Sequence, residues 1–152
     1  EDVLIFAVCL NVTAGLGAAG FAWLDDWLGP KQTIVIALLC LCVCGGGILI
    51  VEGVTWFWIL GMALGIFIGP VQSASRSLMA RMAPPEMTGE MFGFFALSGK
   101  VTSFIGPLMV GTVTALSGNA RLGMSVIVVL MLAGLAILLT VKAPRGRRAA
   151  PE

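Results

Sequence analysis

A single charged residue, Lys100, interrupts the otherwise apolar stretch FGFFALSGKVTSFIGP at residues 92–107. Its ammonium group can bind a carboxylate or another anion, so it is the side chain whose chemistry stands out first. It lies about ten residues, or ~15 Å along a helix, beyond the predicted start of its span, which places it near the middle of a bilayer. Leaving the charge in hydrocarbon would cost at least roughly 2.5 kcal/mol, so we expect Lys100 to face protein or water.

Helical spacing places Lys100 on a small and polar face. The residues of that face follow at steps of three or four: Gly93, Ala96, Lys100, Ser103, Pro107, Gly111 and Thr114. The residues that point away are larger: Phe94, Val101, Ile105 and Leu108. The pattern predicts a face that packs against protein or lines a cavity. No acidic residue of the sequence reaches the same depth, so two readings stay open: a structural ion pair with an acid elsewhere in the protein, or a substrate or coupling role.

Three further polar residues are candidates for the same site. Asn11 lies within the first apolar run, Gln72 follows the Gly69-Pro70 pair, and Ser103 shares the face of Lys100. We predict that Lys100, Gln72, Asn11 and Ser103 bind the substrate or the coupling ion. The alternative for Asn11 is a hydrogen bond between its amide and a neighbouring helix.

The elements that must position these side chains are membrane spans. The chain of 152 residues is 59% hydrophobic and 11% charged, against roughly 25% charged residues in an average soluble domain. Its charges leave five apolar runs that are each long enough to cross a bilayer. We therefore predict an all-α polytopic membrane protein with helices at about 3–24, 33–51, 53–82, 89–117 and 121–141, followed by a basic tail at 142–152.

The distribution of Lys and Arg predicts the orientation. With five crossings, one side carries Arg121 and the other carries Lys31, Arg76, Arg81, Lys142, Arg145, Arg147 and Arg148. By the positive-inside rule the second side is cytoplasmic, so we expect a cytoplasmic carboxyl terminus and an external amino terminus. The tail is predicted to anchor at lipid headgroups and not to bind nucleic acid. The chain lacks an initiator methionine, and we expect it to be a piece of a longer protein.

Metal, redox and enzymatic chemistry are not expected. Cys9, Cys40, Cys42 and Cys44 lie in predicted spans, the spacing of CLCVC does not suit a metal knuckle, and the chain has no histidine. The sequence also has no paired carboxylates within the predicted spans. We therefore predict no metal, no cofactor and no enzyme activity. Gly15, Gly17 and Gly20 match G-x-G-x-x-G, but they lie in an unbroken apolar run, so helix packing is the better interpretation.

Two Gly-Pro pairs, Gly69-Pro70 and Gly106-Pro107, fall inside the third and fourth spans. Proline removes a backbone donor, and the pairs predict interrupted helices of the kind that border a cavity in transporters. An ordinary kink is the alternative. Upstream of the first pair, the four-residue repeat of Gly61, Gly65 and Gly69 predicts a groove for a neighbouring helix.

Two segments resemble the major facilitator superfamily of secondary transporters. The run GPVQSASRSLMARMAPPEMTGEMFGFFALSGKVTSFIGPLMVG, residues 69–111, is similar to the tenth and eleventh spans of the branch of autophagy-linked vacuolar amino-acid effluxers and their bacterial relatives. LDDWLGPK, residues 24–31, resembles the superfamily's loop motif G-x-L-a-D-r-x-G-r-k, with Asp26, Gly29 and Lys31 in register. Ala22 and Trp27 depart from that motif. The resemblance implies that the chain forms spans eight to twelve of a twelve-span protein, with the N-terminal half of the same transporter as its partner.

The resemblance also implies a function and a gate. The function is secondary active transport of a small solute by alternating access, with amino acids as the substrate class and a substrate carboxylate as the counter-charge of Lys100. The cytoplasmic gate would comprise Asp26, Gly29, Lys31, Arg76, Arg81 and Glu90, with Asp26 against the start of the fourth span and Arg76 or Arg81. A solvated turn acid is the alternative for Asp26. The expected location is a bacterial inner membrane. The competing function is a non-transporting scaffold or assembly subunit in which Lys100 makes a structural ion pair.

Overall fold

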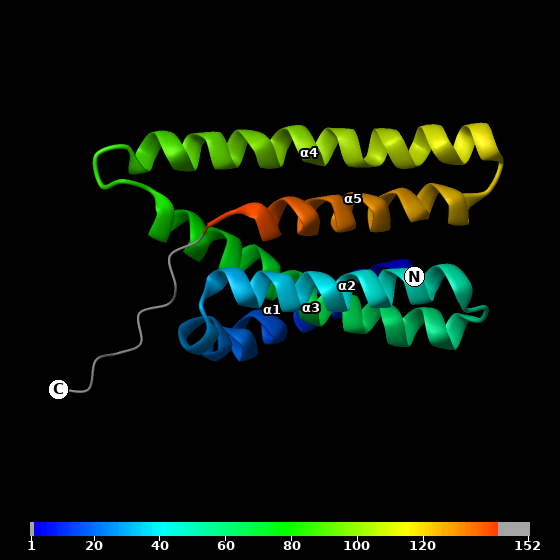
Figure 1. The fold of residues 1–152 in the computed structure, drawn as a ribbon. Helices are drawn as coiled ribbons and strands as arrows, with labels where there is room; N and C mark the ends of the chain where they lie inside the picture. The colour runs from blue at the N-terminus through cyan, green and yellow to red at the C-terminus, as the bar shows by residue number, and fades with distance from the viewer. Residues whose placement is uncertain (1, 143–152) are drawn as a thin grey trace.

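The computed structural model describes residues 2–142 and consists of five α-helices, with no strand in that range. They are α1 (Asp2–Leu28), α2 (Pro30–Ile50), α3 (Val54–Met82), α4 (Thr88–Ser117) and α5 (Ala120–Thr140) (Figure 1). Each is long and apolar enough to cross a membrane. The predicted fold class, an all-α polytopic membrane protein, is confirmed. Most of the predicted basic tail, residues 143–152, lies outside the described residues.

Short polar or glycine-containing turns separate the helices. Between α1 and α2, Gly29 adopts a φ of 90°, a conformation that other residues rarely adopt, and Pro30 then starts α2 at a position where its missing N–H is not needed. Between α4 and α5, Gly118 ends α4 in the left-handed conformation, and the side-chain oxygen of Asn119 caps α5 by accepting from the N–H of Arg121 at 2.9 Å. The chain therefore reverses within a few residues at each membrane surface.

The helices form a row in which α3 packs between α1 and α2, α2 packs on α5, and α5 packs on α4. Figure 1 shows α4 and α5 on one side of the molecule and α1 to α3 on the other. The helices α1 and α4 make no contact, and α4 touches α3 only at a few positions. α1 and α4 therefore lie at the two flanks of the row.

The predicted glycine groove of α3 is confirmed, and α1 occupies it. A side chain added at Gly61 would strike Phe6, one at Gly65 would strike Thr13, and one at Gly69 would strike the backbone of Ala14. Two aromatic contacts lie at one end of this interface, where Phe6 stacks on Phe57 at 5.4 Å and meets the edge of Trp58 at 5.1 Å between ring centroids. Close packing of small residues thus joins α1 to α3.

The packing prediction for the glycines of α1 holds for one residue out of three. Gly17 lies against the backbone of Ile66 in α3, whereas a side chain at Gly15 or Gly20 would meet nothing within 4 Å. The three glycines cannot share one helix face at spacings of two and three residues. Only Gly17 falls on the face that packs against α3.

The two Gly-Pro pairs do not interrupt their helices. Pro70 lies inside the continuous helix α3 and Pro107 inside the continuous helix α4. The prediction of broken helices was therefore wrong. The other backbone groups of these helices of 29 and 30 residues have no water to bond within a membrane, so the helical hydrogen bonds on both sides of each proline are kept.

The tightest packing lies near the start of α2 and the ends of α3 and α5. A cluster of Ile34, Ala74 and Leu78 is buried there, with Leu38, Val71 and Leu138 packed against it. No residue of α4 is buried. We call this end of the bundle the Lys31 end and the opposite one the Glu52 end.

Candidate functional site

Lys100 lies on the exposed surface of α4. Within residues 2–142 its ammonium group makes no ion pair, and its backbone carbonyl accepts a hydrogen bond from Ser103 Oγ at 2.7 Å. Ser103 is exposed beside it, one turn along the helix. The structure thus brings these two predicted residues together and presents both on a helix that is buried nowhere along its length.

The surface around Lys100 is open along most of α4. Added side chains at Gly93, Gly99, Gly106 and Gly111 would each meet nothing within 4 Å. By contrast α5 packs against the far end of α4 through Gly123, where an added side chain would strike Thr114 and the carbonyl of Val110. Of the small face predicted from the sequence, Thr114 is half-buried and the other residues are exposed in the described part of the chain.

Asn11 and Gln72 lie on other helices and do not join Lys100. Asn11 is exposed on α1, and its side-chain amide donates to the carbonyl of Ala7 at 2.8 Å. Gln72 is exposed on α3, just after Pro70. The helices α1 and α4 make no contact, so Asn11 and Lys100 lie on elements that are apart in this chain.

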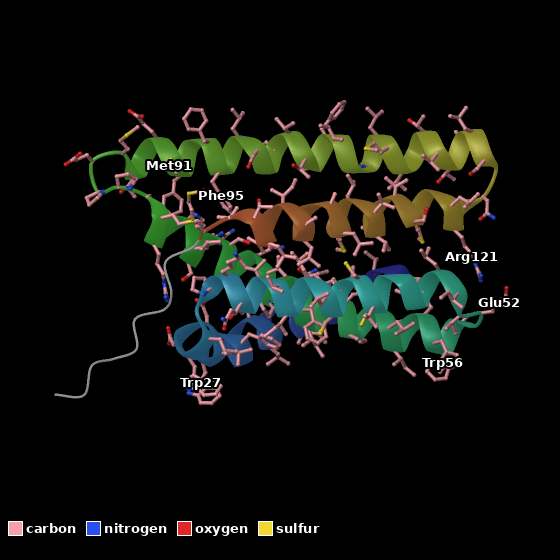
Figure 2. The ribbon with its side chains drawn as sticks, in the orientation of Figure 1. Trp27, Glu52, Trp56, Met91, Phe95 and Arg121 are labelled. Carbon is pink, nitrogen blue, oxygen red and sulfur yellow. The ribbon has the colours of Figure 1, made fainter. Side chains whose placement is uncertain are left out.

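The predicted gate residues gather at the Lys31 end but form no cluster of ion pairs. Asp26, Arg76, Arg81 and Glu90 are all exposed, and Asp26 does not reach the start of α4, because α1 and α4 are apart. Within residues 2–142 the ion pair of the structure joins Arg121 to Glu52 at 3.5 Å, at the other end of the bundle (Figure 2). Asp26 and the start of α4 are therefore not latched together inside this chain.

Among the predicted gate residues, Lys31 bonds to another helix through its side chain. Its Nζ donates to the carbonyl oxygens of Leu139 at 3.2 Å and Val141 at 2.5 Å, both at the end of α5. Its neighbour Gly29 is buried in the turn before α2. Lys31 therefore contacts a helix terminus of the same chain.

The sequence-based selection missed Asp25. One of its carboxylate oxygens is buried and has no hydrogen-bond partner in the described residues, whereas Asp26 next to it is exposed. Asp25 continues the four-residue series of Thr13, Gly17 and Phe21, the α1 residues that face α3. That spacing was the available signal, because it assigns the inward-facing position of the Asp-Asp pair to Asp25.

Aromatic side chains mark both ends of the bundle. Trp23 and Trp27 stack at 6.1 Å between ring centroids near the end of α1, and both are exposed. Trp56 is exposed near the start of α3, and Figure 2 shows Trp27 and Trp56 at opposite ends of the molecule. This is the distribution of tryptophan at the two interfaces of a membrane.

An apolar groove of about 390 Å³ runs between α1 and α3 and contains none of the candidate residues. Its lining residues are Thr13, Leu16, Gly17, Gly20, Phe21 and Ile66. The groove therefore offers no charged group to a polar solute.

Comparisons with known proteins agree with this architecture. Residues 3–151 match the family model described as vacuole effluxer Atg22 like. The chain is 37% identical over 95 residues to autophagy-related protein 22 of Cryptococcus neoformans, an alignment that covers 62% of this chain and 17% of the relative. It is 34% identical over 82 residues to the uncharacterized MFS-type transporter YxiO of Bacillus subtilis, covering 54% of this chain and 19% of the relative.

A longer alignment extends over almost all of the chain. Autophagy-related protein 22 of Coccidioides immitis is 26% identical over 165 residues, covering 95% of this chain and 26% of the relative. The chain thus spans about a quarter or less of the length of these curated relatives.

Proposed function

The chain belongs to the Atg22-like family of vacuole effluxers, and on that premise we propose that it is part of a membrane transporter that moves a small solute by alternating access. One relative carries the name MFS-type transporter, and the family model is named for an effluxer. The proposal assigns the chain the role of one part of a longer protein, because its relatives are several times longer. It assigns no enzyme activity and no cofactor.

The observation that carries the proposal is the open position of Lys100. A lysine close to mid-membrane on an exposed helix face cannot remain against lipid without a large free-energy cost. The rest of the protein or water must therefore cover this face of α4. A water-filled cavity with one fixed cation is a suitable site for an anionic group.

The open faces of α1 and α4, at the two flanks of the row, support contact with the rest of the protein. The glycines that pack helices of this chain together, such as Gly17, Gly65 and Gly123, would all clash with an added side chain. Glycines on the two flanks, such as Gly15 and Gly99, would not. We propose that these flanks adjoin the remainder of the transporter and border the solute path, with Asn11, Gln72 and Ser103 as polar contacts.

The proposed substrates are amino acids or other small carboxylates, since a carboxylate supplies the charge that Lys100 lacks. The proposed location is the plasma membrane of a bacterium, with the Lys31 end in the cytoplasm by the positive-inside rule. In that orientation Asp26, Arg76, Arg81 and Glu90 lie exposed at the cytoplasmic surface, where they can form a gate with the rest of the protein.

Transport by the full-length protein in liposomes tests the proposal. Lys100→Met should lower carboxylate uptake by roughly thirtyfold or more, since losing one partner of a desolvated charge pair costs at least about 2 kcal/mol. Lys100→Arg should keep part of the activity, and Lys142→Met, which changes an exposed lysine beyond α5, should leave uptake unchanged. Normal uptake by a folded Lys100→Met protein would refute the role of Lys100.

The second candidate function is a scaffold or assembly subunit in which Lys100 pairs with an acid of another helix. It rests on the same unsatisfied charge. In that case Lys100→Met should abolish accumulation of the protein, and neutralising the paired acid of the partner helix, Asp to Asn or Glu to Gln, should restore it. The unaltered protein would also catalyse no solute uptake in liposomes, which separates this function from transport.

A further inference from the structure

The helices α2 and α5 run antiparallel and are joined by a cation at each end. At the Lys31 end, Lys31 at the start of α2 donates to the carbonyl oxygens of Leu139 and Val141 at the end of α5, at 3.2 and 2.5 Å. The contact reaches across 108 and 110 residues of sequence. The end of α5 is thus held by the first turn of α2.

The Glu52 end repeats the arrangement with the two helices exchanged. Arg121 at the start of α5 donates through Nη1 to the carbonyl of Leu49 in the last turn of α2, at 3.4 Å, and lies 3.5 Å from Glu52 just beyond that helix. Figure 2 shows Arg121 and Glu52 facing each other at this end. Each helix therefore supplies, from its first turn, a cation to the last turn of the other.

The chemistry of helix termini explains why a cation from one helix is favourable at the C-terminal end of the other. The last four carbonyl groups of a helix have no intrahelical partner, and the C-terminus carries a partial negative charge. Neither α2 nor α5 has a basic residue in its own last turn. Lys31 and Arg121 are unfavourably placed for the dipoles of their own helices, so their benefit comes from the helix opposite.

Between the two ends the contact is apolar. Gly45 of α2 faces Val128 of α5, and Leu138 packs on the cluster that contains Ile34. These helices have the highest hydropathy of the five. In a membrane, apolar packing alone stabilises one axial alignment of α2 and α5 little more than another. The reason is that lipid is as apolar as leucine and valine.

We infer that Lys31 and Arg121 are reciprocal caps that set the axial register of α2 against α5. Polar contacts between helices are known to specify register where apolar packing does not. A slip of one turn, about 5.4 Å, would take both cations out of hydrogen-bond range at once. The inference does not depend on transport, and it gives Lys31 a positioning role inside this chain that is separate from its proposed place in a gate.

Disulfide cross-linking of the full-length protein tests the register. The native Cys9, Cys40, Cys42 and Cys44 are first replaced by serine. Gly45→Cys with Val128→Cys reports the register of the structure, in which these positions face each other. Gly45→Cys with Ser125→Cys or with Met131→Cys reports a slip of about one turn in either direction.

The register of the structure should dominate in the parent protein. In the Lys31→Met/Arg121→Met protein, the ratio of slipped to aligned cross-links should rise about fivefold, the effect expected for losing interhelical hydrogen bonds in a membrane. The Lys31→Arg/Arg121→Lys protein should keep the parent ratio, because both caps remain cationic donors. An unchanged ratio in the Lys31→Met/Arg121→Met protein overturns the inference. If that protein does not insert, the two single variants are compared, and parent ratios in both overturn it equally.

Discussion

Gly17 of α1 lies directly against the backbone carbonyl of Ile66 in α3, with no room for a side chain between them. That carbonyl is the one that Pro70, four residues later, leaves without its helical hydrogen bond. A bare carbonyl is costly in a membrane, and the close approach of a glycine covers it and allows a Cα–H···O contact. The glycine of one helix and the proline of another therefore act as a pair.

Replacing Gly17 should destabilise the protein. Gly17→Ala would force α1 away from α3 and expose the Ile66 carbonyl, at an expected loss of about 1–3 kcal/mol of stability, as for other overpacked sites. The measurement is the melting temperature of the full-length protein in detergent, followed by size-exclusion chromatography. Gly15→Ala is the matched control because its added methyl group meets nothing, and equal melting temperatures for the two variants would contradict the prediction.

Gly123 should be equally sensitive on the other side of the molecule. It is buried where α5 meets α4, and an added methyl group would strike Thr114 and the Val110 carbonyl. Gly123→Ala should lower the melting temperature, and Gly134→Ala in the same helix should not, since the space beside Gly134 is open. If Gly134→Ala lowered the melting temperature more than Gly123→Ala, the close contact between Gly123 and α4 would be contradicted.

The aromatic contacts of Phe6 should stabilise the Glu52 end. Phe6 meets both Phe57 and Trp58, and two such pairs at about 0.5–1.5 kcal/mol each predict a loss of about 1–3 kcal/mol for Phe6→Ala. Ile5→Ala is the control, because Ile5 is exposed on α1. Thermal melts of the two variants under identical conditions decide the question, and a loss no greater in Phe6→Ala than in Ile5→Ala would count against this packing.

Hydropathy was enough to locate the five helices, because each apolar run is bounded by charged or turn residues such as Asp25 and Gly118. Spacing was enough for the groove of Gly61, Gly65 and Gly69, since residues four apart share a helix face. The partner of that groove could not be read from sequence. Helix pairing depends on which faces meet in space, and Gly17 gives no local signal that it lies opposite Ile66.

The site was less accessible to prediction than the fold. The Gly-Pro pairs predicted breaks in two helices, but Pro70 lies inside the continuous helix α3 and Pro107 inside the continuous helix α4. A helix surrounded by membrane keeps its remaining backbone hydrogen bonds, because its polar groups have no water to bond there. Lys31 matched a loop motif, yet its partners are carbonyl groups of α5, which no motif records. The loop motif aligns with Asp26, and it carries no signal for Asp25, which helical spacing places toward α3.

The surroundings of Lys100 can be measured with a thiol probe. In the full-length protein without its native cysteines, Lys100→Cys should react with a charged, membrane-impermeant thiol reagent, because the proposed cavity holds water and the thiolate forms only in contact with water. Val101→Cys is the control: it lies at the same depth on α4, is exposed, and points away from the small face, so lipid should shield it. An unreactive Lys100→Cys in a folded protein would mean that position 100 is dry, and would remove Lys100 from the solute path.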